Sequence, residues 1–206
     1  MKKLINLIKI NKKVQIAGIL AILLLAGAAF FLKGRIIIED GEVALSNGLA
    51  TIYYGDASLA RGEEVCVDVK LSNFKGEYQA ASFQINFDKN RLEFKEIRQG
   101  NIEIINKKSG EVVIPEWQYN ADTANQKGTI STMYLDMTAE DNPICGSNVT
   151  SESDILFRLV FKVKDSYNEG DELTLKTLQA TFAAIDENDS LAVYKSNINT
   201  PDGVLK

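Results

Sequence analysis

The chain contains no histidine, only three prolines and only two cysteines among its 206 residues. Without histidine, the Ser-His and Cys-His catalytic pairs and the histidine-containing zinc sites are excluded. The sequence also lacks a Gly-x-Ser-x-Gly elbow and a Gly-Lys-Ser/Thr phosphate loop. Its 28 acidic residues would bring some carboxylates together by number alone, so no pair identifies a glycosidase. We therefore expect a non-catalytic protein without a metal site.

Positive charge is clustered only in the first residues of the chain. The formal net charge is −5 and the isoelectric point is near 5.0. Nucleic-acid binding needs a clustered basic surface, which argues against a nucleic-acid partner. The hydrophobic fraction of 45% is ample for the core of one folded domain with an appendage.

The single long apolar run lies near the N-terminus. Residues 1–13 are rich in lysine, and residues 14–32 contain only one strongly polar side chain, Gln15. Nineteen helical residues span roughly 28 Å, close to the hydrocarbon thickness of a bilayer. The excess of lysine before the run predicts a transmembrane signal anchor with its N-terminus in the cytoplasm. Residues 33–47 would form a short stalk, and the remainder would lie outside the cell membrane.

The run has two alternative interpretations. A cleaved signal peptide would use the small residues 26–28 as its cleavage site, and the protein would then be secreted. The apolar run exceeds an ordinary signal-peptide core, so the uncleaved anchor is preferred. A pilin-type helix needs an early glutamate, and the first glutamate of the chain is Glu39.

Residues 48–206 show the alternation of apolar and polar side chains that is typical of β-strands. The stretch "FQINFDKNRLEF" predicts two strands joined by a turn at residues 88–90. Their apolar side chains are assigned to the core: Phe83, Ile85, Phe87, Leu92 and Phe94. About nine such strands, with no amphipathic helix between them, predict an all-β fold, an antiparallel jelly-roll β-sandwich. Further strands are expected at Leu49–Tyr54, Ile102–Ile105, Val112–Tyr119, Thr129–Met137, Glu172–Lys176, Ala180–Ile185 and Ala192–Tyr194.

Three stretches resemble the cohesin domain family. They are "GEEVCVDVKLSN" with "AASFQINFDKNRLEFKEIRQGN", then "SDILFRLVFKVKD", and finally "EGDELTLKTLQATFAAIDENDSLAVY". The resemblance runs from about Ala57 to the C-terminus. The resemblance implies a jelly-roll β-sandwich, the fold that cohesins share with related carbohydrate-binding modules.

Cohesins bind dockerin domains through one sheet face and so attach enzymes of polysaccharide catabolism to a cellulosome scaffold or cell surface. The resemblance therefore implies a dockerin-like or other cell-surface protein partner. The family's polar recognition positions fall at Ala80 and Ser82 in this sequence. We expect the partner-binding face to comprise Ala80, Ser82, Gln84 and Asn86. A structural domain of an envelope assembly is an alternative.

A second alternative is polysaccharide binding. Trp117 and Tyr119 lie two residues apart, so on one strand they would share a face, and flat aromatic rings stack on sugars. Burial of Trp117 in the core is the preferred interpretation, because a sandwich of this size often buries its only tryptophan.

The two cysteines and two acidic turns complete the candidate sites. Cys66 and Cys145 permit one disulfide outside the cytoplasm, with two free thiols as the alternative. The turns at residues 140–142 and 186–190 carry oxygen ligands suited to calcium, but neither has the spacing of an EF-hand loop. We expect solvated turns and no cofactor.

Overall fold

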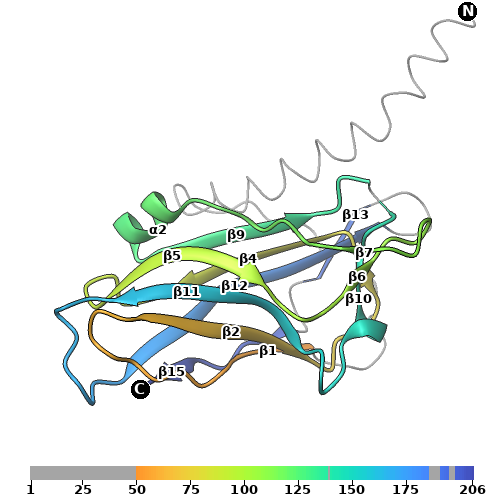
Figure 1. Cartoon of the computed structure of the whole chain (residues 1–206). Helices are drawn as coiled ribbons and strands as arrows, with labels where there is room; N and C mark the ends of the chain where they lie inside the picture. Colours follow the sequence, from red (N-terminus) through yellow and green to blue (C-terminus); the bar gives the residue numbers. More distant parts are fainter. Residues whose placement is uncertain (1–49, 139, 186–190, 195–197) are drawn as a thin grey trace, which may run out of the picture.

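The computed structural model describes residues 50–138, 140–185, 191–194 and 198–206, and for residues 185 and 191–194 it describes the backbone alone. In these residues two sheets face each other across a hydrophobic core (Figure 1), which confirms the predicted β-sandwich. No helix in the described ranges has the length and apolar character needed to cross a bilayer. The anchor predicted at residues 14–32 and the stalk predicted at 33–47 lie outside these ranges.

The first sheet has five strands. Their order is β14 (Ile198–Asn199), β1 (Ala50–Tyr54), β2 (Glu64–Ser72), β11 (Ile155–Val163) and β5 (Leu92–Gln99). The pair β1 and β14 is parallel, whereas the other pairs are antiparallel. The prediction of a purely antiparallel sandwich is therefore wrong for this one pair of strands.

The second sheet has six strands and carries the candidate site. Its order is β13 (Leu191–Tyr194), β12 (Leu173–Ile185), β4 (Ala80–Asn86), β9 (Thr129–Leu135) and β8 (Gln118–Tyr119), and β15 (Gly203–Leu205) pairs with the start of β12. Two small pairs complete the fold: β3 (Glu77–Tyr78) with β10 (Ile144–Cys145), and β6 (Ile104–Ile105) with β7 (Val112–Val113). A one-turn 3-10 helix, η1 (Gly146–Asn148), follows β10.

The described chain has fifteen strands rather than about nine, and it has a helix that was not predicted. Helix α2 (Ala121–Lys127) begins after Asn120, whose side chain accepts a hydrogen bond from the Thr123 amide. It ends at Gly128, which adopts a left-handed conformation with φ of 73°. The expected strand 112–119 is split into β7 and β8, and the strands expected at 172–176 and 180–185 are one long strand, β12.

The core assignments made from "FQINFDKNRLEF" are confirmed. All five predicted core side chains are at most 3% exposed. The ring of Phe83 lies 5.8 Å from that of Trp117 and 5.4 Å from that of Phe157, between centroids. The turn is also confirmed, because the Asp88 carboxylate accepts a hydrogen bond from the Asn90 amide at 2.9 Å.

The hydroxyl of Tyr54, on β1, is expected to make the free energy of unfolding fall as the pH rises above about 10. Burial raises the pKa of Tyr54 from 10.0 to about 12, and its hydroxyl shares a 2.6 Å hydrogen bond with Thr177. In the unfolded chain this tyrosine would ionise near pH 10, so its contribution is complete below pH 10 and is lost between about pH 10 and 12. The expected loss is about 2–3 kcal/mol.

Urea unfolding followed by circular dichroism across pH 9–12 measures this loss. Tyr54→Phe should reduce the pH dependence by the contribution of this tyrosine. Thr177→Val keeps the ionisable hydroxyl while removing its partner, and should retain the dependence. A steep loss of stability that is unchanged in Tyr54→Phe would show that other groups cause it.

Candidate protein-binding face

Each sheet has an inner face that contacts the core and an outer face. The register between paired strands shows which side chains lie on each face. On β4, Ala81, Phe83 and Ile85 belong to the core cluster, so the alternate residues point outward. The outward residue Gln84 is paired with Ser131 on β9 and with Gln179 on β12. Because paired residues point to the same side, the outer face can be followed across β12, β4, β9 and β8.

We call this outer surface the neutral face. Its members carry hydroxyl, amide or apolar side chains, with one lysine and no carboxylate: Ala80, Ser82, Gln84, Asn86, Gln118, Thr129, Ser131, Met133, Leu135, Lys176, Gln179, Thr181 and Ala183. The side chains of Ser82, Gln84 and Ser131 form no hydrogen bond with a described residue. Two other members are held internally, since Asn86 donates to the Gly128 carbonyl at 2.9 Å and Gln179 donates to Thr181 at 3.3 Å.

The outer face of the five-stranded sheet is chemically opposite. It carries a ladder of ion pairs between neighbouring strands and within strands: Arg158 with Asp68 at 3.0 Å, Arg98 with Glu96 at 2.6 Å, Lys95 with Glu93 at 2.8 Å and Lys70 with Asp154 at 3.3 Å. The hydrogen bond from Lys95 lowers the pKa of Glu93 below its ordinary value. Many of the charges on this face are therefore paired within the protein, whereas Ser82, Gln84 and Ser131 on the neutral face have no such partner among the described residues.

The four predicted partner-binding residues all lie on the neutral face, but they differ in access. Ser82 and Gln84 are half-buried and Asn86 is exposed. Ala80 is 0% exposed, because its short side chain lies between its register neighbours Leu135 and Ala183. Of the four predicted residues, Ala80 is thus the one whose side chain is not accessible in this structure.

Sequence reasoning missed the contributions of the strands beside β4. Ser131 and Met133 stand on β9, and Gln179 stands on β12. The alternation in "TISTMYL" could have shown that Ser131 and Met133 share a face. Which face of β4 they accompany becomes known only from the register.

The alternative sugar platform does not exist in the structure. Trp117 is 8% exposed, as the preferred interpretation expected, and its ring lies 4.6 Å from that of Phe157. Tyr119 is 39% exposed, and its ring forms a T-shaped pair with that of Phe94. Because one ring is in the core and the other is at the surface, the two cannot form a shared flat surface.

The cysteines are free thiols, so the permitted disulfide is not formed. Cys66 is on the outer side of β2, whereas Cys145 is in the β3–β10 pair. Burial, followed by the nearby Glu77 carboxylate, raises the pKa of the Cys145 thiol.

The calcium alternative has no support in the described residues. Within them, no group of three or more acidic or cysteine side chains is placed to hold a metal ion. Asp141 is instead paired with Lys108 at 2.7 Å. The acidic turn at 186–190 lies outside the described ranges.

The described chain is thus a β-sandwich with an accessible sheet face that carries no carboxylate. The family model of the cohesin domain matches residues 51–200, and the chain therefore belongs to the cohesin domain family. Cohesin domains are non-catalytic binding modules, which is consistent with the expectation of a non-enzyme. A search against curated proteins gives no match.

Solved cohesin structures share the fold at low sequence identity. The seventh ScaB type I cohesin from Pseudobacteroides cellulosolvens has 18% identity and a TM-score of 0.57, covering 77% of this chain and 91% of that chain. The third ScaC cohesin from Acetivibrio cellulolyticus, solved in complex with the ScaB dockerin, has 20% identity and a TM-score of 0.57, covering 77% and 98%. The OlpA cohesin of Clostridium thermocellum, also solved with a dockerin, has 19% identity and a TM-score of 0.53, covering 77% and 98%.

Proposed function

We propose that this chain is a non-catalytic attachment module that binds a dockerin-type protein through the neutral face. The observation that carries the proposal is the row of side chains of Ser82, Gln84 and Ser131, which are accessible yet form no hydrogen bond with a described residue. The structural relatives solved with dockerins have the same fold. Family membership supports a protein partner in preference to a polysaccharide.

The chemistry of the face suits a protein partner. Hydroxyl and amide groups can donate and accept hydrogen bonds, and each bond contributes about 0.5–1.5 kcal/mol net. Met133 and Leu135 add apolar area on β9 beside these groups. Neutral groups also cost less to desolvate than ions, so a sheet face without carboxylates can be covered at low cost.

The partner's specificity should differ from that of an ordinary cohesin. Ala80 and Ser82 stand where the resembling family places polar recognition side chains. Ala80 is buried, and Ser82 offers a short neutral hydroxyl. The matching dockerin surface should therefore supply hydrogen-bonding groups that reach Gln84 and Ser131.

A capture experiment decides the class of partner. The full-length chain is tested against immobilised dockerin-bearing proteins from the same organism and against a panel of insoluble polysaccharides. We expect retention on at least one dockerin and none on the polysaccharides. Polysaccharide retention that Tyr119→Ala abolishes would overturn the proposal, and retention on neither would favour a structural envelope domain.

We further propose that residues 14–32 anchor the module to the cell membrane, with the sandwich on the outer side. The lysine-rich residues 1–13 before the apolar run support this orientation. Cohesin domains are generally extracellular or at the cell surface. Membrane fractions washed with high salt should retain the chain, and an external protease should release the sandwich; recovery of a shortened chain from the medium would instead indicate signal cleavage.

A further inference from the structure

The hairpin of β6 and β7 carries an aliphatic surface that faces solvent. Ile104 and Val113 are paired and face the core, whereas Ile105 and Val112 are paired on the opposite side. Ile105 is 37% exposed, Val112 is 54% exposed and Ile114 is 67% exposed. We call these three residues the aliphatic surface. The solvent side of a two-stranded hairpin is normally polar, so this clustering calls for a partner.

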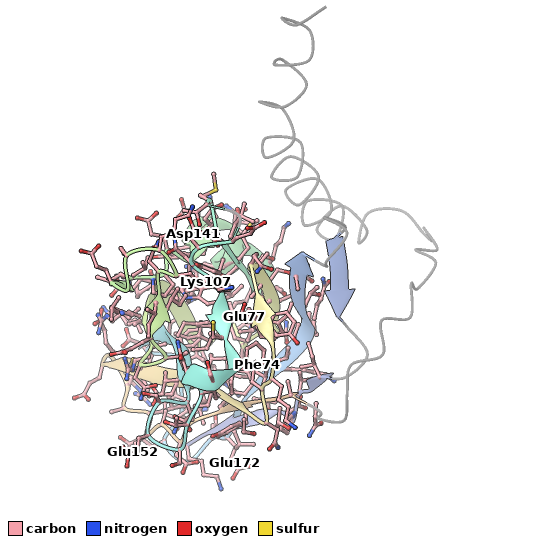
Figure 2. All side chains as sticks on the ribbon, turned by 90° about the vertical axis from the view of Figure 1, so that its right-hand side faces the viewer. Phe74, Glu77, Lys107, Asp141, Glu152 and Glu172 are labelled. Atoms are coloured by element: carbon pink, nitrogen blue, oxygen red, sulfur yellow. The ribbon has the colours of Figure 1, made fainter. Side chains whose placement is uncertain are left out.

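The hairpin is held firmly against the rest of the protein. Asn106 closes its turn by accepting hydrogen bonds from the amides of Lys108 and Ser109. The Lys107 amide donates to the Asp141 carbonyl at 2.7 Å, and the Asn106 side chain donates to Asn142 at 2.8 Å. Figure 2 shows Lys107 between Asp141 and Glu77. A fixed surface loses little conformational entropy on binding, which favours specific recognition.

The charges around the aliphatic surface are negative. Both lysines of the turn are neutralised, Lys107 by Glu77 and Lys108 by Asp141. The neighbouring carboxylates Glu103 and Glu116 are exposed and form no ion pair with a described residue. Glu103 lies two residues before Ile105, and Glu116 lies two residues after Ile114, and both side chains are exposed.

The location separates this surface from the neutral face. The hairpin follows β5, an edge strand of the five-stranded sheet, and leads to β8, an edge strand of the six-stranded sheet. Figure 1 shows β6 and β7 beside β10, at the end of the sandwich away from the C-terminus. The aliphatic surface therefore lies at that end of the sandwich, where the chain passes from one sheet to the other.

We propose that the aliphatic surface is a second docking site, and that it binds a protein segment whose aliphatic side chains are flanked by lysine or arginine. The unpaired Glu103 and Glu116 would meet the basic residues, and the three aliphatic side chains would be covered. A second copy would place these carboxylates against each other, and an anionic bilayer would be repelled by them. The charge pattern thus favours a basic amphipathic segment over both. This inference does not depend on the neutral face binding a dockerin.

The test uses the full-length protein and two synthetic helical peptides of the same pattern, one of leucine and lysine and one of leucine and glutamate. Fluorescence anisotropy should show binding of the Leu-Lys peptide only. The double variant Val112→Thr with Ile114→Thr should weaken that binding by about tenfold or more, because two covered aliphatic side chains are lost. Glu103→Gln with Glu116→Gln should weaken it several-fold and reduce its salt dependence.

Matched variants distinguish the site from general attraction to an acidic protein. Leu178→Thr with Val204→Thr changes exposed aliphatic residues elsewhere, and Glu63→Gln with Glu169→Gln removes exposed charges elsewhere. Both should bind the Leu-Lys peptide as the wild type does. The inference is overturned if these controls lose as much affinity as the hairpin variants, if neither peptide binds, or if both bind equally. Self-association that Val112→Thr with Ile114→Thr abolishes, seen in sedimentation, would also overturn it by identifying a second copy as the occupant.

Discussion

Replacing Phe83 with alanine is expected to lower the free energy of unfolding by about 3–5 kcal/mol. The Phe83 side chain is 1% exposed and lies between the two sheets. Its ring contacts those of Trp117, Phe157 and Phe182, at centroid distances of 5.8, 5.4 and 5.7 Å. Truncation removes these contacts and leaves a cavity that rigid strands on both sides cannot close.

Chemical denaturation of the full-length protein, followed by tryptophan fluorescence, measures this effect. The only tryptophan is Trp117, which contacts Phe83, so the signal reports on the affected part of the core. Ser82→Ala is the matched control, because the neighbouring side chain points away from the core and should change stability by less than about 0.5 kcal/mol. A loss below about 1 kcal/mol for Phe83→Ala would contradict the packing described.

Replacing Asp136 with alanine should cost about 3 kcal/mol or more, although it removes only one side chain of a loop. Asp136 is 4% exposed, and its carboxylate accepts hydrogen bonds from the amide and hydroxyl of Thr138 and from the Asn142 amide, at 2.9, 2.5 and 2.9 Å. Without the carboxylate these donors lose their partner. Loss of order should spread to the hairpin, because Asn142 also holds Asn106.

Thermal unfolding and amide exchange together check this prediction. Glu140→Ala removes an exposed carboxylate from the same loop and should leave stability nearly unchanged. Asp136→Ala should lower the melting temperature and speed exchange at residues 104–113. An effect of Asp136→Ala no larger than that of Glu140→Ala would show that the carboxylate does not organise the loop.

The long strands could be predicted from the sequence, because one of their faces is buried and their residues alternate. The five assigned core residues of β4 to β5 are all buried for this reason. Strands of two residues, such as β3, β10 and β14, are too short to show an alternation. Helix α2 has cap residues that the sequence shows, Asn120 and Gly128, but its seven residues bury only Ala124, so they carry no amphipathic pattern.

The candidate site was predicted only along one strand. Alternation placed Ser82, Gln84 and Asn86 together, whereas the neighbours on β9 and β12 depend on a register that spacing does not reveal. The bulge in β12 at residues 177–179 shifts that register by one residue. The burial of Ala80 depends on tertiary packing around a small side chain, which local patterning cannot show.

The most direct test of the central claim is isothermal titration calorimetry with a dockerin that the wild-type chain retains. The full-length wild type, Gln84→Arg, Ser131→Arg and Lys162→Glu are compared. Lys162 is exposed on the opposite sheet, so its variant is the control for a change of charge. We predict that each substitution on the neutral face weakens binding at least about tenfold, and that Lys162→Glu binds like the wild type. Unchanged binding by both neutral-face variants, with loss of binding in Lys162→Glu, would contradict the account.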